Sequence, residues 1–307
     1  MTATIIFLIA GMFAATVPLL FAALGELVVE KSGMLNLGIE GMMAVGAAAG
    51  FVTVALTGSH WLGLAAGAVA ALSVSMVFAT LSIFFLANQV ATGLAVGVLG
   101  LGISAAIGKN YEGTTVPTMG KIDFGFLSDI PIIGPSFFNH DPIVYLAIIM
   151  AIVLWYILKH TKLGLVIRAV GESPESANAL GYPVSRIRFL AVLFGGAMAG
   201  IGGAYLSTIY TSLWADGMVA GRGWIAVSLV VFGSWILPRV AIGAYLFGAI
   251  SLLELSIQGL GFDIPSQILS ASPYIITIIV LVVISRNRAY IQLNSPRSLG
   301  QTYKSSH

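Results

Sequence analysis

The chain has 307 residues, of which 58% are hydrophobic and only 8% are charged, with a formal net charge of +2. Soluble domains carry about 25% charged residues, so this composition excludes a soluble protein and indicates a chain embedded in lipid. The small net charge argues against a nucleic-acid partner, and the absence of cysteine excludes disulfides, thiolate metal sites and cysteine nucleophiles.

Apolar segments long enough to cross a bilayer follow one another along the chain. Only helices satisfy their own backbone hydrogen bonds within hydrocarbon, so we predict an all-α fold: one polytopic helical bundle over residues 1–307, with about eight to ten membrane helices. The first segment lacks a basic start and runs long, which is typical of a spanning helix rather than a cleaved signal. The predicted spans are 4–24, 37–57, 61–86, 89–108, 143–158, 188–210, 223–237, 239–257 and 272–285.

Small residues recur four positions apart within several of these spans. Such spacing lets helix backbones approach closely, so that van der Waals contact replaces the missing hydrophobic driving force. Any single pair is explained by general membrane packing, but together they predict a tightly packed bundle. The sets are Gly46/Gly50, Gly63/Gly67, Gly93/Gly97, Gly196/Gly200 and Gly195/Ala199/Gly203.

Polar side chains interrupt the early spans at a few positions. Glu40 follows Asn36 in a segment where Gly38 and Gly41 suggest a broken or closely packed helix, and such breaks expose backbone groups to a cavity. Burying an ionised glutamate costs roughly 2–3 kcal/mol, so Glu40 needs a reason, and both a pathway role and a packing-hinge role are open. For Glu254 a polar contact near a helix end is favoured. The candidate pathway residues are Asn36, Glu40, Asn88, Gln89 and Thr92, with Ser104 as a further polar position.

Cations are concentrated in the 159–188 loop and in the tail. The positive-inside rule places both in the cytoplasm, so the C-terminus is expected there and the long segment 109–142 is expected on the outside. Nine spans would put the N-terminus outside. A half-membrane helix hidden in 25–42 or 86–95 would give ten and bring it inside.

The 159–188 loop contains signals for a short helix. Ser173 suits the N-cap, Pro174 suits the first turn, and Gly181 suits the position just after the last turn. These residues predict a helix at about 174–180, roughly 10 Å long. A helix this short is not stable alone, so it docks either on the protein's own surface or on a soluble partner.

The sequence contains no catalytic motif. No G-x-x-x-x-G-K-[ST] motif for binding ATP phosphates occurs; the nearest approach, Gly113 to Lys121, has six residues between its glycines and ends in Ile122. The four histidines are scattered, so metal chemistry has no support. We therefore expect a non-enzymatic protein, powered by a separate ATPase or by an ion gradient.

Several segments resemble one family of transporters. Residues 161–174, Thr-Lys-Leu-Gly-Leu-Val-Ile-Arg-Ala-Val-Gly-Glu-Ser-Pro, resemble the cytoplasmic coupling loop of ABC-importer permeases for ribose, branched-chain amino acids and nucleosides. Residues 30–43 resemble the second-helix motif of the nucleoside branch, and Asn88-Gln89 and Gly221-Arg-Gly-Trp-Ile-Ala extend the match. The resemblance runs from about residue 20 to 285 and is greatest to the shorter permease of nucleoside uptake systems that depend on basic membrane proteins.

Two positions depart from the family pattern. Ser173 stands where the family often has asparagine, another good N-cap, and Trp224 stands where phenylalanine is frequent.

The resemblance implies a permease subunit of the vitamin B12-type architecture in the bacterial inner membrane, forming half of a pathway for nucleosides or related purine and pyrimidine compounds. The implied partners are a second permease in a heterodimer, a cytoplasmic ATPase that holds ATP and Mg, an extracytoplasmic substrate-binding lipoprotein and membrane lipid, with no cofactor in this chain. The residues that would couple to the ATPase are Arg168, Ala169, Gly171, Glu172, Ser173, Pro174, Ala177 and Gly181.

Alternative functions remain open from the residues. Within the same class the cargo could be a simple sugar such as ribose, or a branched-chain amino acid. From a different class, an autonomous ion-coupled carrier or channel has no need of the capped short helix in the 159–188 loop, so that helix favours the ABC permease.

Overall fold

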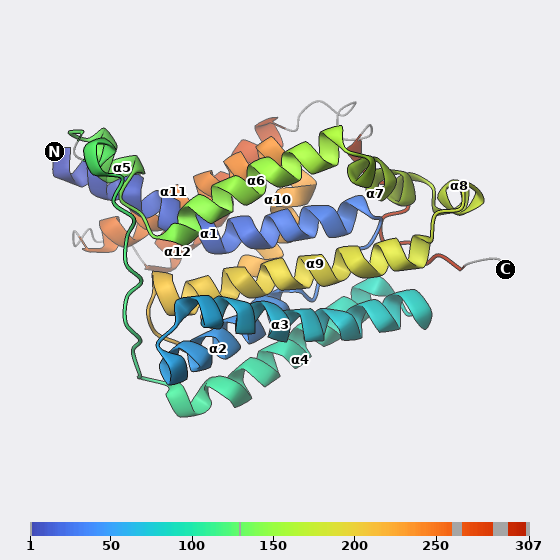
Figure 1. The fold of residues 1–307 in the computed structure, drawn as a ribbon, viewed down its shortest axis with the longest axis horizontal. Helices are drawn as coiled ribbons and strands as arrows, with labels where there is room; N and C mark the ends of the chain where they lie inside the picture. The colour runs from blue at the N-terminus through green and yellow to red at the C-terminus, as the bar shows by residue number, and fades with distance from the viewer. Residues whose placement is uncertain (1, 129, 260–265, 285–293, 305–307) are drawn as a thin grey trace.

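The computed structural model describes residues 2–128, 130–259, 266–284 and 294–304. Within these ranges the chain is almost entirely helical, and its only extended pairing is an isolated bridge between Thr115 and Leu213. The all-α prediction is confirmed (Figure 1).

Seven helices in the described ranges are long and apolar enough to span a bilayer. They are α1 (Thr2–Lys31), α2 (Ile39–Thr57), α3 (His60–Ala79), α4 (Gln89–Gly108), α6 (Pro142–His160), α9 (Val184–Tyr205) and α11 (Leu237–Gly259). Short π-helical turns, Thr80–Phe84 and Leu206–Tyr210, extend α3 and α9. The remaining α-helices are α5 (Ile133–Phe137), α7 (Lys162–Glu172), α8 (Pro174–Ala179), α10 (Arg222–Phe232) and α12 (Ser266–Ile284).

Helices α1, α2 and α9 form the centre of the bundle. Helix α9 packs along α1, α2 and α3, while α4 packs on α2 and α11 packs on α1 (Figure 1). Large side chains from the three central helices are fully buried, among them Phe21, Phe51 and Tyr205. Helices α4 and α6 lie at the outside and keep most of their surface exposed, as expected for helices that face lipid or another membrane subunit.

Glycines allow α2, α3 and α9 to meet at one place. A Cβ atom added to Gly46 of α2 would lie 2.5 Å from the Cα atom of Gly200 on α9, and one added to Gly67 of α3 would lie 2.8 Å from the carbonyl oxygen of Gly46. Real Cβ contacts are not this short, so the three backbones touch directly at this junction. The tight packing predicted from the small-residue spacing is present here.

The two ends of the bundle differ in what they carry (Figure 1). The start of α1 and helix α5 lie at one end, which we call the α5 end. Helices α7 and α8 and the C-terminal segment lie at the other, which we call the α8 end. The N-terminal end of α1 and helix α8 therefore lie at opposite ends of the bundle.

The predicted first span, 4–24, ends too early. Helix α1 continues to Lys31, so Glu26 and Glu30 are helical and fully buried. Between them lie Leu27, Val28 and Val29, whose burial against the bundle extends the helix beyond the purely apolar run.

The predicted span 223–237 is wrong as a complete crossing. Helix α10 has only 11 residues, which is about 16 Å at 1.5 Å per residue and too short to cross the hydrocarbon. The chain reaches it through residues 211–221, which contain neither an α-helix nor a π-helix. Ala220 and Gly221 have positive φ angles of 51° and 83°, and this left-handed backbone cannot continue a right-handed helix.

Candidate functional site

Two helices begin inside the bundle, and their first turns meet. Helix α2 follows the non-helical residues 32–38, and α10 follows 211–221. Glu40, in the first turn of α2, accepts hydrogen bonds from the backbone N–H groups of Gly221 (to Oε1, 2.7 Å) and Gly223 (to Oε2, 2.7 Å). A carboxylate is stabilised at a helix start because the unpaired N–H groups there carry partial positive charge. Glu40 therefore joins the starts of α2 and α10, and we call this contact the Glu40 junction.

The Glu40 junction leaves no space for a side chain at Gly223. A Cβ atom there would lie 2.6 Å from both the backbone nitrogen and the Cα atom of Glu40. Glu40 itself is only 4% exposed. The carboxylate is thus enclosed by backbone dipoles, and the positive charge of Arg222, between the two donor residues, also acts on it.

Asn36 holds the turn that leads into α2. Its Oδ1 accepts a hydrogen bond from the N–H of Gly38 at 3.0 Å, and its own N–H donates to Glu26 Oε1 at 3.3 Å. Trp224, at the start of α10, donates from Nε1 to the carbonyl of Leu37 at 3.3 Å and is 49% exposed. Asn36 is therefore buried as a backbone support, while Trp224 presents an aromatic surface beside the same turn.

The start of α4 contributes the other predicted pathway residues. Asn88 is the N-cap, and its Oδ1 accepts the backbone N–H three residues later at 3.0 Å. Gln89 is buried; its Oε1 accepts the N–H of Leu35 at 2.8 Å, and its Nε2 donates to the carbonyl of Gln301 at 3.1 Å. Thr92 follows in the first turn and is also buried. Gln89 thus connects α4 both to the 32–38 segment and to the C-terminal segment.

Sequence reasoning missed two buried carboxylates on α1. Glu26 and Glu30 are one helical turn apart, and Glu30 Oε2 accepts a hydrogen bond from Trp235 Nε1 at 2.6 Å. Glu26 holds Asn36 in the 32–38 segment before α2, and Glu30 holds Trp235 in the turn after α10. Their four-residue spacing continues the helical period of α1. This spacing is the sequence signal that could have placed Glu26 and Glu30 in the helix.

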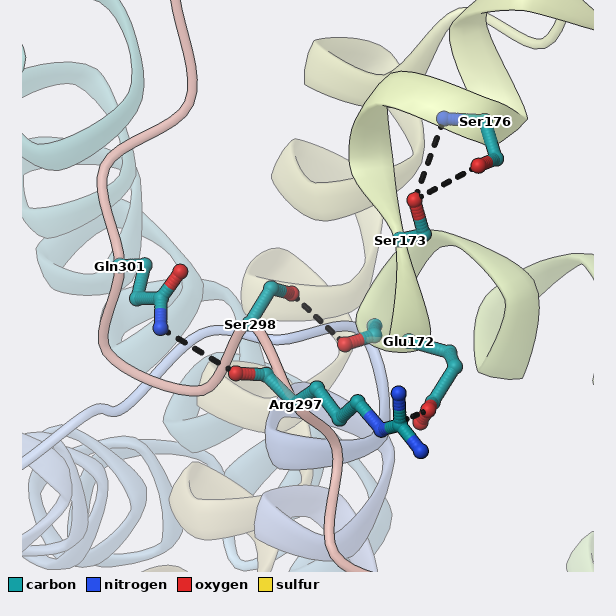
Figure 2. Close-up of polar contacts among 7 residues, drawn as sticks. Glu172, Ser173, Ser176, Arg297, Ser298 and Gln301 are labelled. Carbon is teal, nitrogen blue, oxygen red and sulfur yellow. Dashed lines mark hydrogen bonds and ion pairs between the residues drawn. The ribbon is translucent and has the colours of Figure 1, made fainter.

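Helices α7 and α8 form a sharp elbow at the α8 end. Ser173 Oγ accepts the N–H of Ser176 at 3.2 Å and donates to Ser176 Oγ at 2.8 Å (Figure 2). Pro174 is the first residue of α8, and Gly181 just beyond the helix has a φ of 86°. The short helix lies where the sequence predicts it, with the cap residues in the expected positions.

The predicted coupling residues divide into a buried and an exposed set. Gly171, Pro174 and Ala177 are buried, and Ala177 packs in a small cluster with Val170 and Val184. Arg168 and Glu172 are exposed, and Ala169 and Ser173 are partly exposed. The buried set shapes the elbow, whereas the exposed set is available to another molecule.

Two exposed apolar side chains beside α8 were not singled out from sequence. Leu180 is 76% exposed and Tyr182 is 40% exposed. Exposed large apolar residues next to a short, solvent-facing helix are typical of a protein–protein contact. Among the described residues no group of three or more His, Cys, Asp or Glu side chains is arranged to hold a metal ion.

Comparisons with known proteins agree with these observations. The family described as branched-chain amino acid transport system, permease component, matches residues 8–285. A putative glucose ABC transporter permease protein of Haloferax volcanii is 39% identical, covering 96% of this chain and 97% of its own. A guanosine ABC transporter permease protein of Bacillus subtilis is 36% identical over 86% and 87%, and a nucleoside ABC transporter permease protein of Lactococcus lactis is 31% identical over 91% and 92%.

Proposed function

The chain belongs to the family of branched-chain amino acid transport system permease components, and from this premise we propose that its cargo is a nucleoside or a related purine or pyrimidine compound. It is a multi-pass membrane protein and a permease subunit of an ABC transporter. The observation that carries the cargo proposal is the similarity, over nearly the full length, to permeases named for guanosine and for nucleosides.

A sugar is the second candidate cargo. It is favoured by the 39% identity to the putative glucose permease of Haloferax volcanii. Both candidates carry a hydroxylated sugar ring, so a pathway suited to one is chemically close to a pathway suited to the other.

The translocation pathway, in this proposal, passes the Glu40 junction. Broken helices with their starts near the middle of the membrane are a recurring feature of transport pathways, because they expose backbone dipoles where a solute passes. Asn36, Glu40, Asn88, Gln89 and Thr92 would shape it, largely by holding backbone turns in place. The half-exposed ring of Trp224 offers a surface on which a base could stack.

Energy, in this proposal, comes from a separate ABC ATPase that binds ATP and Mg and contacts α8. The α8 end would then be cytoplasmic, with the C-terminus, in a bacterial inner membrane. A second permease would complete the pathway, and an extracytoplasmic lipoprotein would deliver the cargo to the α5 end. The exposed Leu180 and Tyr182 beside α8 support the ATPase contact.

Reconstituted transport tests the cargo. The complete importer is placed in liposomes, and ATP-dependent uptake of radiolabelled guanosine is measured in the presence of excess unlabelled adenosine, ribose, glucose or leucine. We expect adenosine to compete and the sugars and leucine to have no effect. Uptake of radiolabelled glucose is measured in parallel, and uptake of glucose without uptake of guanosine would establish the second candidate in place of the first.

The energy source is tested in the same liposomes. Uptake should require both ATP inside and the ATPase subunit, and should stop with a non-hydrolysable ATP analogue. Uptake that persists in liposomes lacking any ATPase would instead identify an ion-coupled carrier or channel.

A further inference from the structure

The C-terminal residues 294–304, which we call the tail, lie against the elbow between α7 and α8. The carbonyl of Gly171 accepts hydrogen bonds from Ser298, one from its backbone N–H at 3.0 Å and one from its Oγ at 2.7 Å. Arg297 forms an ion pair with Glu172 at 2.7 Å (Figure 2). The tail is therefore attached at the last turn of α7, immediately before α8.

The same tail also reaches the elements that lead to the Glu40 junction. The carbonyl of Gln301 accepts the hydrogen bond from Gln89 Nε2 at 3.1 Å, and the N–H of Gly300 donates to the carbonyl of Gly33 at 3.2 Å. Gln89 in turn holds Leu35. Two to three residues beyond Ser298, the tail is thus bonded to the 32–38 segment and to α4.

Arg188 of α9 fastens the tail from inside. Its guanidinium donates to the carbonyl of Ser32 (3.1 Å), to Ser298 Oγ (2.9 Å) and to the carbonyl of Gln301 (3.2 Å), and the residue is only 2% exposed. A buried charge is tolerated only where its donors are satisfied. Removing the tail would leave two of these three hydrogen bonds unmade. The tail is therefore needed to satisfy the buried guanidinium of Arg188.

The contact between the tail and the 32–38 segment is close-packed. Gly33 has a φ of 89°, and a Cβ atom there would lie 2.8 Å from Arg188 Nη2 and would overlap Ser298 Oγ. Ser298 is 5% exposed. The tail, Gly33 and Arg188 are therefore packed directly against one another.

We propose that the tail is a positioning element that carries displacement of the α7–α8 elbow to Gln89 and the 32–38 segment, and so to the Glu40 junction. This inference rests on the proposed function, because the displacement would come from the ATPase at α8. It assigns Ser298, Arg188 and the Gln301 carbonyl a role in coupling, although none of them faces the ATPase or the cargo in this arrangement.

Two truncations test the tail. A stop after Asn294 removes every tail contact from Ser298 to Gln301, whereas a stop after Lys304 keeps all of them and serves as the control. Each importer is reconstituted, and ATP hydrolysis and cargo uptake are measured together. For the stop after Asn294 we expect assembly and ATP hydrolysis to persist while cargo carried per ATP falls at least about tenfold, the factor by which loss of one charge-assisted hydrogen bond shifts an equilibrium.

A milder variant keeps the test decisive if the long truncation fails to assemble. Ser298→Ala removes the Oγ contacts with Gly171 and Arg188, and Thr302→Ala removes an exposed hydroxyl from the same tail as a control. We expect the cargo-to-ATP ratio to fall for Ser298→Ala alone. An unchanged ratio for Ser298→Ala in a well-assembled importer would overturn the proposal.

Cross-linking tests whether the tail stays attached to α7 during transport or has to detach from it. The chain has no cysteine, so Glu172→Cys and Arg297→Cys can be joined by a short bifunctional thiol reagent without background. A positioning element that stays attached predicts an unchanged cargo-to-ATP ratio after cross-linking. Uptake that stops on cross-linking would show that the tail has to detach, and would refute the proposal. A wild-type importer without ATP-dependent uptake would instead refute the proposed function.

Discussion

The environment of Glu40 shows how backbone groups can hydrogen-bond a buried carboxylate. Each of its oxygens accepts one backbone N–H, at Gly221 and at Gly223. Charged hydrogen bonds of this kind are roughly twice as strong as neutral ones. The sequence alone does not explain why Glu40 is buried, because its hydrogen-bond partners lie far from it in the chain.

Changing Glu40 to glutamine should weaken the junction. The amide nitrogen would face a backbone N–H, leaving one donor unpaired at a cost of about 1–3 kcal/mol. We expect Glu40→Gln to lower transport strongly and to lower the unfolding temperature in detergent. Glu112→Gln, an exposed glutamate in the loop after α4, should change neither. Wild-type transport and stability in Glu40→Gln would contradict a structural role for the carboxylate charge.

Helix α8 is six residues long and is held by its neighbours rather than by its own hydrogen bonds. Pro174 and Ala177 face inward, so substitutions there, like those at Gly171, would report on packing of the elbow. The exposed Leu180 is therefore the sharper position at which to test a contact with another protein.

Leu180→Asp should weaken binding of the ATPase. Burying an exposed leucine side chain in a contact contributes about 2 kcal/mol, which corresponds to roughly 30-fold in affinity. Co-purification from detergent measures the effect, and the unfolding temperature should be unchanged because Leu180 is 76% exposed. Phe126→Asp at the α5 end, where Phe126 is 82% exposed, is the matched control and should leave co-purification intact.

The junction of α2, α3 and α9 depends on glycine. Gly200→Ala would place a methyl group 2.6 Å from the Cβ atom of Ala71 and closer still to the carbonyl oxygen of Gly67. Overpacking of this kind costs about 1–3 kcal/mol, so we expect a lower unfolding temperature. Gly102→Ala on α4 adds the same methyl group where nothing lies within 4 Å and should be neutral. Equal stability of the two variants would show that the helices can separate without penalty.

The whole molecule has two distinct ends, and only one carries the α7–α8 elbow (Figure 1). The cations of the 159–188 loop lie at the α8 end. By the positive-inside rule we therefore expect this end to face the cytoplasm.

Cysteine labelling tests this orientation in intact cells. Glu175→Cys on α8 and Glu112→Cys in the loop after α4 each introduce the only thiol in the chain, at exposed positions. A membrane-impermeant maleimide should label Glu112→Cys in intact cells and Glu175→Cys only after permeabilisation. The reverse pattern would invert the predicted topology.

The sequence by itself determined the membrane class, the positions of most spans, the short α8 helix and the absence of an ATP-binding motif. Each of these depends on composition or on cap residues within a few positions of one another. The 223–237 prediction failed because apolar composition does not reveal a backbone break, which here follows the end of α10 at Phe232, where Ser234 and Trp235 have positive φ angles of 55° and 54°.

Only the tertiary structure decided how the candidate site is assembled. Glu40 meets Gly221 and Gly223 across 181 and 183 residues, and the tail meets Gln89 across 212 residues. Backbone groups make half of each of these contacts, and every residue carries the same backbone groups. No pattern of side chains could therefore have identified Gly221, Gly223 or Gln301 as partners; their positions follow from how the helices pack and where they break.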